Sequence, residues 1–141
     1  MARIKIDFPE NFHFSTNIPV RITDLNYGGH VGNDTILSII HEARIQYLQS
    51  LGYSEKDLGG TGLIMGDVVI NFKNEVFYGD TITASVAVTN ISRASFDFVY
   101  LLKKGDVVAA EAKTGMICFD YEKRKVTALP EEVNRRFSSA E

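Results

Sequence analysis

The clearest hydrophobic pattern in the chain has the period of an α-helix and runs from Asn33 to Leu51. Its apolar positions follow one another at alternating spacings of four and three residues: Ile36, Ile40, Ala43, Tyr47 and Leu51. Asn33 or Asp34 can cap the start, and Gly52 can end the helix. The pattern predicts one helix about 28 Å long, buried along one side.

From Asp67 onward the hydrophobic period changes to two, which is typical of β-strands. Alternating runs cover residues 67–72, 81–89, 95–103 and 107–119, and Gly105 with Asp106 suits a tight hairpin turn. These strands would form an antiparallel meander whose apolar face needs a cover, and only the helix at 33–51 is long enough. We therefore expect an α+β fold, a long antiparallel sheet wrapped around one central helix.

The remaining segments have weaker patterns. Residues 3–7 predict a short edge strand or arm that Pro9 ends, and residues 14–22 predict a strand. Four glycines between residues 53 and 66 predict a mobile loop, with a short helical turn at 54–58 capped by Ser54. Pro130 and the two glutamates after it predict a short helix to Phe137, packed at the rim of the sheet.

Composition excludes several classes of protein. With 141 residues and 45% hydrophobic content, residues 1–141 are expected to form one domain. The net charge is −3 and the basic residues are scattered, so nucleic-acid binding is not expected. Cys118 is the single cysteine and predicts a small buried hydrophobe, and the three histidines show no metal-ligand spacing. The first twelve residues contain no unbroken apolar run, so we expect no signal peptide, no membrane span and a cytoplasmic protein.

One motif resembles a known family. Arg21, Asp24 and the run Gly29-His30-Val31 with Asn33, followed on the helix by Glu42-Ala43-Arg44, resemble the signature of hotdog-fold acyl-CoA thioesterases of the 4-hydroxybenzoyl-CoA thioesterase-like family. The turn of that family reads Asp-x-Asp-x-x-x-Gly-His-Val-Asn-Asn. The Gly79-Asp80 corner between two predicted strands agrees as well. The resemblance covers roughly residues 15 to 138.

The resemblance implies hydrolysis of an acyl-CoA or acyl carrier protein thioester by water, with coenzyme A present only as part of the substrate and no other cofactor. It also implies a homodimer joined edge to edge, or a tetramer of such dimers, which would cover the exposed edge of the sheet. The alternative is a hotdog protein that binds acyl-CoA or an acyl carrier without cleaving it. A hydratase fits less well, because the hydratase turn has an Asp five residues before its His, where this chain has Leu25.

The candidate site is the glycine-rich turn that leads into the helix. Gly28, Gly29 and Gly32 allow the backbone to approach a ligand closely, and we assign Gly29 to substrate binding. A helix begins with free N–H groups and a partial positive charge, which suits the oxyanion of thioester hydrolysis. The resemblance places that donor at the backbone N–H of Asn33. The alternative is a turn that only tightens the corner between strand and helix.

Two residues depart from the family turn. The second Asp, which is the catalytic carboxylate in one branch of the family, is Asn26 here, and the first Asn of the Asn-Asn pair is Gly32. Asn26 can orient a water molecule or a carbonyl but cannot act as a base. Glu42 with the preceding His41 is the best replacement, since another branch takes its carboxylate from this helix.

The other readings of these side chains stay open. Glu42 could simply pair with Gln46, and His41 could be a solvated helix residue. Asp24 could instead anchor the turn to Arg21 or Arg44. His30 could act as a base, position the substrate or brace the turn.

Substrate contacts are the least determined part of the sequence. Lys73 and Arg93, together with Lys103 and Lys104, lie near predicted strand ends and could bind the phosphates of coenzyme A, although each could equally be plain surface charge. Tyr27, Phe72 and Phe77 could line a channel for the acyl group, or belong to the core.

Overall fold

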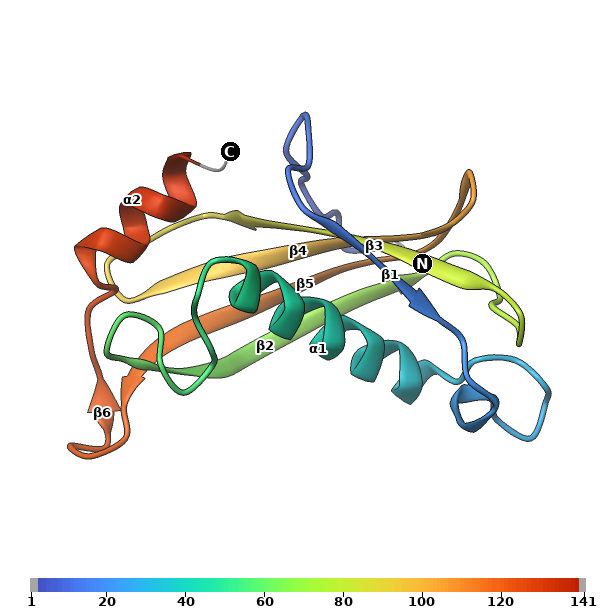
Figure 1. Cartoon of the computed structure of the whole chain (residues 1–141), viewed down its shortest axis with the longest axis horizontal. Coiled ribbons are helices and arrows are strands. Elements are labelled where there is room, and N and C mark those ends of the chain that lie inside the picture. The colour runs from blue at the N-terminus through green and yellow to red at the C-terminus, as the bar shows by residue number, and fades with distance from the viewer. Residues whose placement is uncertain (1–2, 140–141) are drawn as a thin grey trace.

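The computed structural model describes residues 3–139. Six strands form one antiparallel sheet in the order β1-β3-β4-β5-β2, with the short β6 paired to β5 (Figure 1). The elements, in chain order, are β1 Ser15–Pro19, the 3₁₀ helix η1 Ile22–Asp24, α1 Asn33–Ser50, β2 Gly62–Phe72, β3 Thr81–Thr89, β4 Ser95–Lys104, β5 Val107–Asp120, β6 Lys125–Val126 and α2 Glu131–Ser139.

The central helix α1 packs against one face of this sheet (Figure 1). Strand β1 pairs with β3 at the edge of the sheet opposite β2 and leads into the turn before the helix. The helix buries the stripe expected from its period, which contains Ile36, Ile39, Ile40, Ala43, Arg44, Tyr47 and Leu48. Gly52 follows the helix with φ +82°, the left-handed conformation in which glycine ends helices. The predicted hotdog arrangement of sheet and helix is confirmed.

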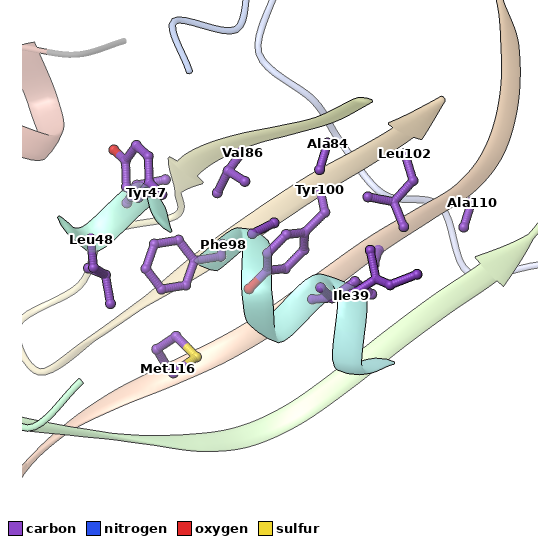
Figure 2. Close-up of a cluster of buried hydrophobic side chains, with 14 of the residues drawn as sticks. Ile39, Tyr47, Leu48, Ala84, Val86, Phe98, Tyr100, Leu102, Ala110 and Met116 are labelled. Carbon is purple, nitrogen blue, oxygen red and sulfur yellow. The ribbon is translucent and has the colours of Figure 1, made fainter. Parts of the chain in front are cut away.

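The core is richest in aromatic rings where the end of α1 meets α2. The ring of Phe137 lies 5.1 Å from that of Phe96, and the rings of Tyr47 and Phe98 lie 5.8 Å apart. Figure 2 shows Tyr47, Leu48 and Phe98 above the sheet, with Tyr100 and Leu102 further along. The predicted helix at the rim of the sheet is present, and because Phe137 is fully buried, the apolar side of α2 also closes one end of the core.

The segment before β2 differs from its sequence prediction. Strand β2 begins at Gly62 and not at Asp67, because Gly62 to Met65 pair with Phe119 to Met116. A Cβ at Gly62 would lie 2.3 Å from the Tyr121 ring, so this glycine makes room for a side chain within a strand. No helical turn forms at 54–58, where Ser54 and Asp57 exchange two backbone hydrogen bonds of 3.2 Å. The loop before β2 is therefore shorter than its four glycines predict.

The N-terminal residues form an arm and not a strand. Residues 3–14 contain no strand, and the strand predicted over 14–22 is confined to β1, Ser15–Pro19. The amide of Asn71 donates a 2.8 Å hydrogen bond to the carbonyl of Ile4, which holds the arm against the sheet. Of the two sequence predictions for residues 3–7, the arm is correct. Within residues 3–139, no helix has the length and apolar character needed to cross a membrane.

The outer strand β2 leaves an apolar strip uncovered. Met65, Val68 and Phe72 are 42%, 38% and 40% exposed. They pair with Met116, Thr114 and Ala110 of β5, which are buried, so all three point to the helix side of the sheet. The helix makes its most extensive contacts with β1 and β3, and the three side chains of this strip stay partly exposed. One edge of the sheet therefore presents both unpaired backbone groups and apolar side chains.

Candidate active site

The N-terminus of α1 is open. Gly32 is the N-cap with extended backbone angles, and no side chain of residues 3–139 caps the helix, so the expectation that Asn33 or Asp34 does so is wrong. The first helical hydrogen bond runs from the N–H of Ile36 to the carbonyl of Gly32. Among the described residues, no group accepts the N–H of Asn33. This donor, with the partial positive charge of the helix, is available to an anion.

Asn26 holds the turn that precedes the helix. Its side-chain Oδ1 accepts the N–H of Gly28 at 2.8 Å and that of His30 at 3.4 Å. The backbone closes the same loop, since the N–H of Asn26 donates to the carbonyl of His30 and that of Gly29 to the carbonyl of Asn26. Gly29 has φ +83°, which most side chains would resist. The turn is therefore fixed by hydrogen bonds between its own residues.

A cavity of about 180 Å³ lies beside the helix start. It brings together four residues selected from the sequence, His30, Asn33, Phe72 and Lys73, and adds the carboxylate of Glu75. The N–H of Val31 donates to the carbonyl of Val76 at 2.8 Å and so ties the segment after β2 to the turn. His30 Nδ1 lies 3.2 Å from the carbonyl of Val31, so we assign the proton to Nδ1.

Three of the predicted substrate contacts lie outside this cavity. Tyr27 is fully exposed, and Gly29 lies on the exposed side of the turn. Arg93 lies between β3 and β4, at the opposite end of the sheet from Lys73. A single chain therefore does not place the two cations at one phosphate site.

Glu42 belongs to a different cavity. It lies nine residues after Asn33, about 13 Å along the helix, and lines a cavity of about 290 Å³ next to β1. Gln46 Nε2 donates to Glu42 Oε2 at 2.6 Å, so the pairing alternative raised by the sequence is present. Asp24 accepts the N–H of Arg21 at 2.8 Å and a bond from its guanidinium at 3.3 Å, as expected for an anchor of the turn. Neither carboxylate reaches the cavity at the helix start.

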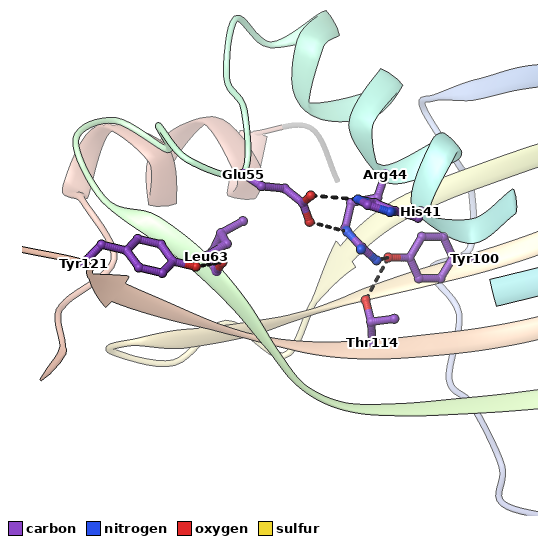
Figure 3. Close-up of polar contacts among 7 residues, drawn as sticks. All are labelled: His41, Arg44, Glu55, Leu63, Tyr100, Thr114 and Tyr121. Carbon is purple, nitrogen blue, oxygen red and sulfur yellow. Dashed lines mark hydrogen bonds and ion pairs between the residues drawn. The ribbon is translucent and has the colours of Figure 1, made fainter. Parts of the chain in front are cut away.

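His41 takes part in a polar network between α1 and the sheet (Figure 3). Its Nε2 lies 2.8 Å from Glu55, whose other oxygen accepts a 2.9 Å bond from Arg44 Nε. Arg44 also donates to the hydroxyl of Tyr100 at 3.1 Å, and that hydroxyl lies 2.7 Å from the Thr114 hydroxyl. Sequence reasoning missed this network. Its one signal was the spacing of His41 and Arg44, which places them on the same helix face.

The network changes the acidity of two of its members. Partial burial alone would raise the pKa of Glu55, but the hydrogen bond from His41 and the charge and hydrogen bond of Arg44 outweigh burial and lower that pKa. Burial raises the pKa of Tyr100 against the opposing effect of Arg44. The carboxylate thus stays ionised and the phenol stays protonated at neutral pH.

We expect the network to contribute to stability in a pH-dependent way. Because the folded state lowers the pKa of Glu55, its contribution is present above the usual value of 4.5 and is lost as pH falls through the lower folded value. Urea unfolding at a series of pH values should show that Glu55→Gln flattens the acid loss of stability. Glu122→Gln, an exposed glutamate in the β5–β6 turn, serves as the control. Parallel curves for wild type and Glu55→Gln would contradict this prediction.

Comparison with known families agrees with the fold. A family model described as the thioesterase-like superfamily matches residues 20–137. The chain belongs to the thioesterase-like superfamily.

Individual relatives are distant. A 1,4-dihydroxy-2-naphthoyl-CoA hydrolase of Nostoc punctiforme is 28% identical over 123 residues, which cover 85% of this chain and 83% of that protein. An acyl-CoA thioesterase of Haemophilus influenzae is 24% identical over 88% of this chain and 93% of its own length. The structure of a Thermus thermophilus thioesterase complexed with coenzyme A and Zn superimposes with a TM-score of 0.82 at 23% identity, covering 94% of this chain and 97% of that one.

Proposed function

We propose that the protein hydrolyses an acyl-CoA thioester to a carboxylic acid and free coenzyme A. The observation that carries this proposal is the free N–H of Asn33 at the open start of α1, bordering a cavity with His30 and Lys73, in a chain of the thioesterase-like superfamily. Its relatives named as CoA thioester hydrolases support the same reaction. Acyl carrier protein is a second carrier for the same thioester.

The chemistry of the reaction fits this donor. When water attacks the thioester carbonyl, negative charge develops on the oxygen, and a donor fixed in advance stabilises it without rearrangement. One such donor is worth on the order of 10² to 10³ in rate. His30, in the same cavity, orients the acyl group or the attacking water, and Lys73 binds a phosphate of coenzyme A. Coenzyme A enters only as part of the substrate, and we propose no further cofactor.

We propose a homodimer in which β2 pairs with β2 of a second copy. The strip of Met65, Val68 and Phe72 and the unpaired edge of β2 would both be covered. Antiparallel pairing places the start of one β2 beside the end of the other. Arg93 of one copy would then lie at the same end as Lys73 of the other, which supports a phosphate site shared by two subunits.

We expect Val68→Asp to convert the dimer to monomers, because a charge in the middle of the strip would be buried without a partner. Sedimentation equilibrium measures the mass directly and also distinguishes a dimer from a tetramer. Val107→Asp introduces the same charge at an exposed position of the β4–β5 hairpin, on the strand beside β2 and not on the edge strand itself, and should leave the mass unchanged. A wild-type monomer would refute the dimer.

Hydrolysis is tested by incubating the dimer with acyl-CoAs of different chain length and aromatic character, and detecting free thiol. Release of coenzyme A from at least one of them is the expected result. Saturable binding without release of thiol would favour the alternative of a non-hydrolytic acyl-CoA-binding protein. The same acyl groups attached to acyl carrier protein, assayed in the same way, show which of the two carriers the protein uses. We also propose a cytoplasmic location, in keeping with a single unpaired cysteine that is buried.

A further inference from the structure

The carboxylate that the turn lacks at Asn26 has a substitute close by. Asp34 is the second residue of α1 and is exposed; it does not line the cavity at the helix start, but it directly follows Asn33, which does. Within residues 3–139, its carboxylate has no hydrogen-bond or ion-pair partner. Glu42, Glu55 and Asp24, in contrast, are all held by neighbouring side chains.

The space beside Gly32 shows where this carboxylate lies. A Cβ built on Gly32 would come within 2.7 Å of Asp34 Oδ1, closer than real Cβ contacts allow. The same position is 3.7 Å from Cβ and 3.9 Å from Nδ2 of Asn26. The carboxylate of Asp34 therefore folds back over the start of the helix, and it and the Asn26 amide border the same space. Any side chain at residue 32 would have to displace it.

The side-chain amide of Asn26 is oriented in a way that suits the Asp34 carboxylate. Its Oδ1 faces two N–H donors of the turn, so Nδ2, which can only donate, faces the Gly32 side, where the carboxylate can accept. An aspartate at residue 26 would instead bring a second negative charge next to Asp34, and neighbouring carboxylates resist ionisation together. The two departures from the family turn, Asn26 and Gly32, thus have one physical explanation.

We infer that Asp34 is the general base of the proposed hydrolysis. Its carboxylate takes a proton from water as the water oxygen bonds to the thioester carbon, and the carbonyl oxygen becomes an oxyanion held by the N–H of Asn33. The C–S bond then breaks, and the departing thiolate of coenzyme A takes the proton from Asp34. Because Asp34 becomes neutral as the oxyanion forms, the helix start does not face two negative charges at once.

This inference rests on the proposed function, and moving the carboxylate tests it. Asp34→Asn should lower kcat by about 10² to 10⁴. Adding Asn26→Asp to that variant should restore kcat to within about tenfold of wild type. The new aspartate would supply a carboxylate to the space beside Gly32 from the Asn26 side. A role for Asp34 limited to helix stability would show in the thermal midpoint and would gain nothing from Asn26→Asp.

The possible outcomes separate the two proposals. Wild type that releases no coenzyme A from any acyl-CoA overturns the proposed hydrolysis, and the role of Asp34 with it. Active wild type with an equally active Asp34→Asn overturns only the assignment of Asp34. If Asp34→Asn is inactive and the double variant stays inactive, the carboxylate at residue 34 does not act through the space it shares with Asn26, and the inference fails. Loss of activity in Glu75→Gln, with full activity in Asp34→Asn, would move the base to the other unpaired carboxylate at this end of α1.

Discussion

Replacing Asn33 by proline should lower kcat by about 10² to 10³, because it removes the backbone N–H that we propose stabilises the oxyanion. Proline is well tolerated at the first position of a helix, where the N–H has no helical partner. The residue before a proline must be extended, and Gly32 already has φ −72° and ψ 158°. The helix is therefore expected to form normally. The ratio of wild-type to variant kcat, on the acyl-CoA that wild type hydrolyses fastest, then gives the contribution of the missing donor.

The matched control is Asn33→Ala, which keeps the backbone N–H and loses the side chain. It should retain far more activity than the proline variant, while both keep a similar thermal midpoint. Equal losses in the two variants would show that the side-chain amide and not the N–H contacts the substrate. Full activity of Asn33→Pro would remove the oxyanion role from the start of α1.

Arg44→Met should lower the free energy of unfolding by about 3 kcal/mol, the effect of breaking a buried charge pair. Arg44 is 5% exposed, and its guanidinium connects Glu55 to the hydroxyl of Tyr100 (Figure 3). Methionine fills a similar volume but leaves Glu55 with His41 as its one remaining side-chain partner. Urea unfolding at pH 7 gives the difference directly.

Two further variants make the interpretation of Arg44→Met specific. Lys56→Met removes a cation from an exposed position of the neighbouring loop and should change stability by no more than about 0.5 kcal/mol. Adding Glu55→Gln to Arg44→Met should recover part of the loss, because the carboxylate is then no longer left without its cation. A cost below about 1 kcal/mol for Arg44→Met would mean that the network does not hold α1 to the sheet.

The central helix and the glycine-rich turn before Asn33 could be predicted from local pattern, whereas the role of Asn33 as a donor was predicted from the family resemblance. The period of 3.6 from Ile36 to Leu48 requires a helix, and a glycine-rich turn before it leaves an open N-terminus. Glu42 and His41 could not be assigned in the same way. The pairing of Glu42 with Gln46 was one of two interpretations that the sequence left open, and the partner of His41, Glu55, was not predicted at all. The side-chain positions decide both cases and place Glu42 and His41 away from the cavity at Asn33.

The sequence by itself determined the central helix, the strands after it and the corner between turn and helix, since hydrophobic period and glycine position act over a few residues. Only the tertiary structure decided which polar groups meet. Glu75 joins His30 because β2 ends beside the turn, and Arg44 meets Tyr100 because α1 crosses β4. The Asp34 carboxylate and the Asn26 amide border one space because the chain reverses direction at Gly29. These contacts depend on the tertiary path of the chain, which the pattern of neighbouring residues does not specify.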